Sequence, residues 1–155
     1  MRFLTALGVV LAVVGMVPAS IAAGPTTAVN GGGNGTFDGV KSGSHFGFGV
    51  VFGSSTRGHF ECNMAGNSAF ESLHLMAVEG GVTSGHVDVE AGTATFAGAA
   101  TLHVDGQKMP ITYSVEVHEG GPQVGWLHLT VFGSPFGPAF TFPLEHVMTG
   151  QITVH

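Results

Sequence analysis

Apolar and polar residues alternate with a period of two along most of the chain. In the clearest case, Phe46, Phe48, Val50 and Phe52 alternate with smaller or more polar residues. Such alternation is typical of a β-strand with one buried face. The pattern predicts strands over residues 46–52, 58–64, 70–78, 82–90, 93–104, 109–118, 124–132, 140–147 and 151–154.

The turns between these segments are short and contain glycine. Parallel strands need connections of roughly a dozen residues or more, so neighbouring strands should pair antiparallel. We therefore expect an all-β fold, an antiparallel meander that is either closed as a small barrel or folded as a sandwich.

The register of one hairpin follows from the sequence. Asp105-Gly106 is a two-residue turn signal, which places Val104 opposite Gln107. Counting outward, one face pairs Leu102 with Met109, Ala100 with Ile111, Gly98 with Tyr113, Phe96 with Val115 and Ala94 with Val117. The other face is largely polar and sets Thr93, Thr95, Ala97, Ala99, Thr101 and His103 against His118, Glu116, Ser114, Thr112, Pro110 and Lys108. A slip of one residue would exchange the two faces, so both support this register.

Ala91-Gly92 is a second candidate for a two-residue turn. It would set Glu90 against Thr93, Asp88 against Thr95 and His86 against Ala97, with Val87 and Val89 on the core face.

The length of the loop after His118 is not fixed by the sequence. A four-residue loop over residues 119–122 would turn Val124, Trp126 and His128 inward. A loop one residue longer or shorter would instead turn Leu127, Leu129 and Val131 inward.

The N-terminus has the three parts of an export signal. A cation at Arg2, an apolar run to Val17 and small residues before Ala23 predict a signal peptide over residues 1–22. The run is shorter than the ~20 apolar residues that a membrane anchor needs. We expect a flexible, glycine-rich lead-in over residues 23–34 and a single β domain over residues 35–155. The mature protein should be secreted, extracellular or periplasmic, and free of the membrane after cleavage.

Composition narrows the possible functions. The formal net charge is −6, with only four Lys and Arg residues in the chain, so a nucleic-acid-binding role is not expected. Cys62 is the only cysteine and can form no intrachain disulfide. Because Cys62 shares strand parity with Phe60 and Met64, we expect a buried, unreactive thiol.

No motif of a serine hydrolase, a zinc hydrolase or a paired-cysteine metal site occurs in the chain, so we expect neither enzymatic activity nor a cofactor. Nine histidines in so short a chain raise the possibilities of metal binding and of a response to pH. The registers above place five ionisable residues on one outward face of three neighbouring strands. These weak metal candidates are His86, Asp88, Glu90, Glu116 and His118. Strands lie about 4.8 Å apart, so this group also suits a solvated polar face.

Several short phrases resemble one known family, the post-COAP-1 domain of secreted bacterial proteins. They are Gly31-Gly32-Gly33, Phe46-Gly47-Phe48, Gly58-His59-Phe60, Phe96-Ala97-Gly98 and the segment 150–155. The resemblance spans essentially the whole mature chain and implies an exported β module, often a unit within larger surface or extracellular proteins. It implies no established activity. An aspartate-rich stretch of that family corresponds here to residues 118–122, which lack aspartate, and this argues against a cation site in that loop.

The main functional expectation is a secreted, non-catalytic β domain with a structural or ligand-binding role. Its partner is unknown and could lie at an extracellular surface. The alternative is a weak divalent-metal-binding or pH-responsive extracellular protein that uses its surface histidines.

Overall fold

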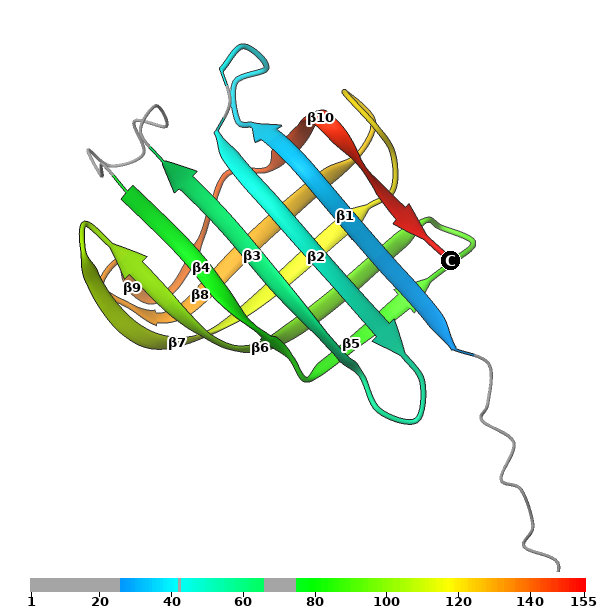
Figure 1. Ribbon diagram of the computed structural model, residues 1–155, viewed down its shortest axis with the longest axis horizontal. Helices are drawn as coiled ribbons and strands as arrows, with labels where there is room; N and C mark the ends of the chain where they lie inside the picture. Colours follow the sequence, from blue (N-terminus) through cyan, green and yellow to red (C-terminus); the bar gives the residue numbers. More distant parts are fainter. Residues whose placement is uncertain (1–25, 42, 66–74) are drawn as a thin grey trace, which may run out of the picture.

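The computed structural model describes residues 26–41, 43–65 and 75–155, so the expected signal peptide lies outside the described residues. The described chain forms ten β-strands, all paired antiparallel in one sheet (Figure 1). They are β1 (Thr27–Thr36), β2 (Ser44–Phe52), β3 (Arg57–Ala65), β4 (Leu75–Val82), β5 (Ser84–Asp88), β6 (Thr93–Val104), β7 (Gln107–His118), β8 (Trp126–Ser134), β9 (Gly137–Thr141) and β10 (Glu145–Val154). No helix among these residues is long and apolar enough to cross a membrane.

The strands follow the order β10-β1-β2-β3-β4-β6-β7-β8-β9, and β10 also pairs with β8. That last pairing closes a ring of hydrogen bonds. The ring is not a regular barrel, because β6 pairs with β5 along its first half and with β4 along its second. In the same way β8 pairs with β10 at one end and with β9 at the other. The expected all-β antiparallel fold is confirmed.

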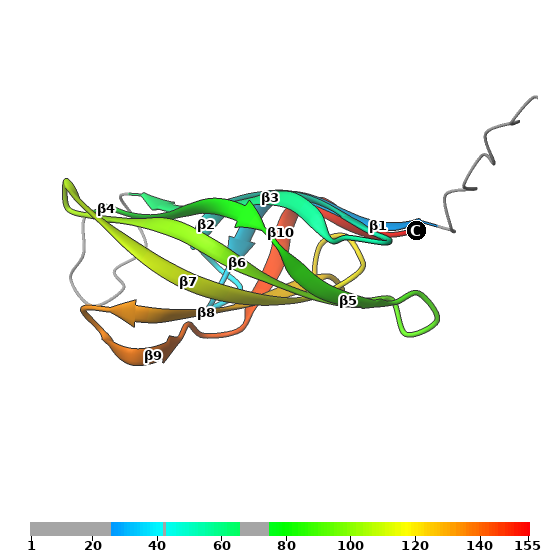
Figure 2. The ribbon, with the colours of Figure 1, turned by 90° about the horizontal axis from the view of Figure 1, so that it is seen from below.

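The ring is flattened into two layers. Seen edge-on, β1, β2 and β3 lie on one side and β7, β8 and β9 on the other (Figure 2). Aromatic rings join the layers across the interior. Phe48 of β2 lies 5.3 Å from Phe96 of β6, and Phe60 of β3 lies 5.2 Å from Tyr113 of β7, measured between ring centroids. Such contacts stabilise the core beyond the area that the rings bury.

The hairpin of β6 and β7 has the predicted register along its whole length, from Thr93 opposite His118 to Val104 opposite Gln107. The predicted core face is the inner one, and Phe96 and Val115 at its centre are fully buried. Cys62 is also buried on β3, as expected. The two-residue turn therefore fixed twelve consecutive pairs.

The predicted turn at Ala91-Gly92 is wrong by two residues. Asp88 is opposite Thr93 and His86 is opposite Thr95, so the loop spans four residues. The Asp88 side chain explains the longer turn, because its Oδ1 accepts a hydrogen bond from the Ala91 amide at 3.0 Å. A shift of two residues keeps each side chain on its face, and Val87 packs against the core as expected. Val89 lies in the loop and is 48% exposed, so it is not a core residue.

Residues 27–34 are not a flexible lead-in, because they form most of β1 between β2 and β10. The glycines of this segment make room for neighbouring side chains. A Cβ atom on Gly31 would collide with the ring of Phe48, and a Cβ atom on Gly35 would collide with the side chain of Glu145. The inner face of β1 is therefore covered by side chains from β2 and β10.

The segment predicted as one strand over residues 140–147 is divided between β9 and β10. Pro143 lies between the two strands, and proline cannot donate a backbone hydrogen bond to a sheet.

The loop after β7 spans residues 119–125 and settles the inward face of β8. Leu127, Leu129 and Val131 are buried, which is one of the two arrangements compatible with the sequence. The loop also bonds to β10: Gly120 and Ile152 exchange two backbone hydrogen bonds, and the Gln123 amide donates to the Val147 carbonyl. We call the β8–β10 pairs together with these loop contacts the seam.

Candidate functional site

The five residues expected on one outward face are found there only in part. His86 and Asp88 lie on β5, Glu116 and His118 lie on β7, and Glu90 lies in the loop between β5 and β6. The corrected register puts His86 and Glu116 on either side of Thr95, and Asp88 and His118 on either side of Thr93. Each pair is thus separated by two strand spacings, roughly 9 to 10 Å.

Strand β8 adds two residues to this face that the sequence did not assign. His128 is directly opposite Glu116, and Trp126 is directly opposite His118. The rings of His118 and Trp126 are nearly parallel, with an interplanar angle of 18° and centroids 5.9 Å apart. His118 is held in place by its Nδ1–H, which donates to the Glu119 carbonyl at 2.8 Å. The Nε2 atom of His118 is then the ring nitrogen left to contact a ligand.

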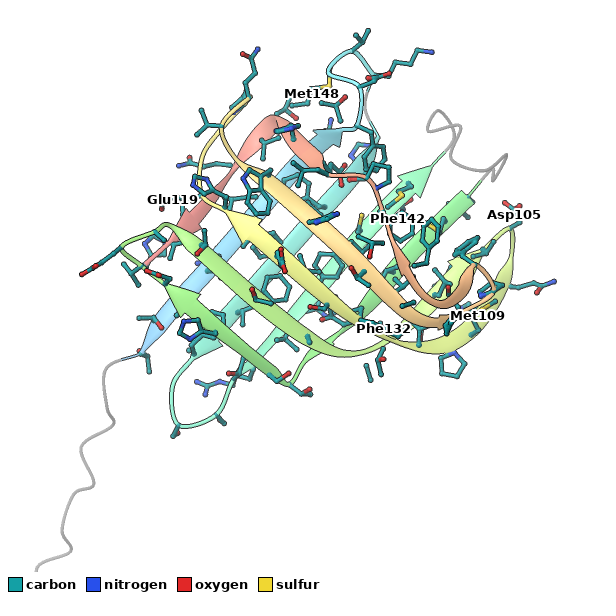
Figure 3. The ribbon with its side chains drawn as sticks, turned by 180° about the vertical axis from the view of Figure 1, so that it is seen from behind. Asp105, Met109, Glu119, Phe132, Phe142 and Met148 are labelled. Atoms are coloured by element: carbon teal, nitrogen blue, oxygen red, sulfur yellow. The ribbon has the colours of Figure 1, made fainter. Side chains whose placement is uncertain are left out.

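We call these outward residues the outer patch. Its members are His86, Glu116, His118, Trp126 and His128. Figure 3 looks onto the outer side of β6, β7 and β8, with Glu119 near one end of this face and Phe132 and Met109 toward the other. No other described strand lies over this face (Figure 3).

The outer patch does not form a metal centre in the described chain. No three His, Cys, Asp or Glu side chains among the described residues come close enough together to hold a metal ion. The physical reason is the pleated sheet, which spaces the residues of one face evenly and leaves the outer members too far apart. All described histidines are half-buried or exposed, so they are surface groups, as expected.

A second polar group lies inside the ring and was not predicted. Glu145 is 2% exposed, and Ser44 is equally buried. The Ser44 hydroxyl donates a hydrogen bond to Glu145 Oε1. Gly35 lies against the Glu145 side chain, and the Cys62 thiol is close enough for the Glu145 charge to act on it. These residues come from β10, β1, β2 and β3, which are consecutive neighbours in the sheet, so the group forms only when the last strand pairs with the first.

Burial dominates the electrostatics of this group. It raises the pKa of Glu145 to about 7, and the Ser44 hydrogen bond opposes the shift without cancelling it. The pKa of Cys62 is raised by burial first and by the Glu145 charge second. The Cys62 thiol therefore stays protonated and unreactive at neutral pH.

The buried group is poorly suited to catalysis. Glu145 is sealed from solvent, so a substrate has no route to it in the closed ring. Ser44 faces a carboxyl group, with no described histidine beside it to take its proton, because every described histidine lies at the surface. What the arrangement can do is bind and release one proton inside the core.

The alternation around Glu145 explains why the sequence did not reveal it. Glu145 has the parity of Val147, which would place it inward, but Phe140 and Phe142 favour the opposite face if the segment is one strand. The break at Pro143 removes that conflict, and Phe142, Glu145 and Val147 are all buried. A strand boundary at the proline was the available signal.

Comparisons of the chain with protein-family models, curated proteins and solved structures find no significant match.

Proposed function

We propose that this protein is an exported, non-catalytic β domain that binds a sugar-like, polyhydroxylated ligand on its outer patch. The observation that supports this most directly is the pair of nearly parallel rings of His118 and Trp126 on the open outer face. A flat aromatic surface packs against the C–H face of a sugar ring, and neighbouring polar groups can orient its hydroxyls.

The surroundings of the ring pair fit such a ligand. Glu116 and His128 lie opposite each other one row away, and they offer an acceptor together with a group that can donate or accept. Hydroxyl side chains of Thr93 and Thr95 complete the face between β5 and β7. A closed interior filled by aromatic contacts also favours binding at the surface over binding inside the ring.

Trp126 provides a direct test, because it is the only tryptophan in the chain. Its fluorescence should change on titration with soluble glucan, xylan or chitin oligosaccharides, and at least one polysaccharide should retard the protein in affinity electrophoresis. Trp126→Ala should abolish the retardation. Phe132→Ala, which alters an aromatic residue elsewhere on β8, should leave it unchanged. Retention of binding by Trp126→Ala, or no binding to any sugar of the panel, would exclude this ligand class for the patch.

Export is tested separately. Mass spectrometry of material secreted by a bacterial host should find a mature chain that begins at or within a few residues of Ala23. An intact Met1 on membrane-bound protein would contradict the proposal of a cleaved signal.

A further inference from the structure

The buried carboxyl group of Glu145 lies where the ring is completed. Glu145 is the first residue of β10, and its Cα partner is Leu127 of β8. Only one further ladder pair, His146 with Trp126, joins these strands. The Glu145 side chain also crosses the inner face of β1 at Gly35 and reaches Ser44 of β2. Glu145 thus lies at the seam itself: its backbone pairs with β8, and its side chain packs on β1 and β2 next to that pairing.

The protein surrounds this carboxyl group with few polar partners. Gly35 of β1 offers no side chain, Ser44 of β2 offers one hydroxyl, Cys62 of β3 offers a thiol, and Leu127 of β8 offers only an apolar side chain. The buried Thr36 hydroxyl is engaged elsewhere, because it donates to Asp38 Oδ1 and accepts from the Gly39 amide.

The other charged groups of these elements lie outside the core. Asp38 and Lys41 are exposed in the loop between β1 and β2, where Asp38 Oδ1 accepts from the Lys41 amide. His45 and His146 are exposed as well, on the outer face of their strands. Cys62 is therefore the one titratable group that faces Glu145 among the described residues, and it is neutral.

An ionised carboxylate is costly in such a place, because its charge loses water and gains one hydroxyl donor with no cation. A protonated carboxyl group keeps the Ser44 contact and carries no charge to desolvate. We propose that Glu145 is a proton-dependent latch: the seam between β8 and β10 is held closed while this carboxyl group is protonated and loosens when the proton is lost.

The direction of the pH effect follows from linkage. Burial raises the pKa of Glu145 to about 7 from its ordinary value of 4.5, so the closed state binds the proton more tightly than the open state. Closure is therefore most favourable below about pH 4.5. It weakens as the pH rises toward 7 and changes little above that value.

The seam is the part of the ring that can respond locally. Opening it breaks the two ladder pairs and the loop bonds to β10 but leaves the long β6–β7 hairpin intact. Such partial openings occur at lower free energy than global unfolding. This inference does not depend on the proposed sugar ligand, because it concerns the interior and not the outer patch.

Amide hydrogen exchange measured by NMR between pH 5 and pH 8, corrected for intrinsic rates, tests the latch. The reporters are the amides of Gln123, Val147 and Ile152, which bond across the seam to Val147, Gly125 and Gly120. Their protection factors should fall by about 100-fold as the pH rises, because each unit of pKa shift corresponds to a tenfold change. Protection in the middle of β6 and β7 should fall less.

The matched variants are Glu145→Gln and Glu79→Gln, the second on an exposed residue of β4. Glu145→Gln should remove the pH dependence at the seam, and Glu79→Gln should keep it. An equal fall in wild type and Glu145→Gln, or a flat wild-type profile, would overturn the latch.

If Glu145→Gln does not fold, the wild-type protein still decides the question. The side-chain carboxyl ¹³C resonance of Glu145 should titrate near pH 7, and seam protection should fall as the pH approaches that value and level off above it. A midpoint below pH 5 would overturn the proposal.

Discussion

The two ends of the interior are built differently. Around the β6–β7 hairpin, Phe48, Phe60, Phe96 and Tyr113 pack ring against ring with no charged group among them. At the seam, Glu145 and Ser44 form a buried hydrogen-bonded pair. The first end is stabilised by the volume that its rings fill, and it should be insensitive to pH. The second depends on close backbone approach and on one proton.

Truncation of the aromatic end should have the largest effect. Phe96→Ala removes a fully buried ring that contacts Phe48 and Phe60, so the free energy of unfolding should fall by about 3 to 5 kcal/mol. Denaturant unfolding at pH 5 and pH 8 should give the same loss. Phe132→Ala, at a ring that is 39% exposed, is the control and should cost much less. A loss below about 1 kcal/mol for Phe96→Ala would contradict the central role of this cluster.

Removal of the hydroxyl at the polar end should have a smaller effect that depends on pH. Ser44→Ala deletes the donor to Glu145, which should cost about 1.5 to 3 kcal/mol at pH 8, where the carboxylate is charged, and about 1 kcal/mol at pH 5. Unfolding curves at the two pH values measure the difference. Ser84→Ala, at an exposed position of β5, should be neutral at both. A larger loss at pH 5 than at pH 8 would mean that the ionised carboxylate is stabilised by something other than Ser44.

Two glycines of β1 allow a matched comparison of backbone approach. Gly35→Ala would place a Cβ atom on the Glu145 side chain, and we expect a loss of about 1 to 3 kcal/mol in the free energy of unfolding. Gly32→Ala meets nothing closer than the Phe46 carbonyl at 3.9 Å and should be nearly neutral. Thermal unfolding of both variants decides the point. Equal losses would show that the cost arises from the backbone of β1 and not from the seam.

The corrected turn after β5 gives the smallest expected effect. Val89→Thr should change the free energy of unfolding by less than about 0.5 kcal/mol, because Val89 is exposed in the loop. Chemical denaturation measures the change. Val87→Thr, one pleat earlier and against the core, should cost more. A larger loss for Val89→Thr than for Val87→Thr would instead support the two-residue turn predicted at Ala91-Gly92.

What could be predicted from the sequence depended on how far apart the interacting residues lie along the chain. The β6–β7 pairs are joined by the Asp105-Gly106 turn, so local chemistry fixed them all. Burial of Cys62 and exposure of the outward residues of β7 followed from the same alternation.

The β1–β10 pairs, such as Val29 with Val154, have no turn to set them. The glycine-rich sequence of β1 therefore resembled a linker, although Gly31 leaves room for the side chain of Phe48 and Gly35 for that of Glu145. The outer patch was predicted in part, since His118 and Glu116 were placed correctly. Trp126 and His128 could not be assigned to it from the sequence, because no turn motif indicates the seven-residue length of the loop after β7.

The pairing of β1 with β10 also bears on the order in which the chain folds. Ala28 and His155 exchange backbone hydrogen bonds, so strands separated by most of the chain become neighbours. Loop closure of that length is entropically costly and slows folding, whereas the β6–β7 hairpin can form early from local contacts. Until β10 arrives, β1 and β8 each expose an unpaired edge, and such edges attract other chains. The completed ring is thus also the state in which this protein is best protected from aggregation.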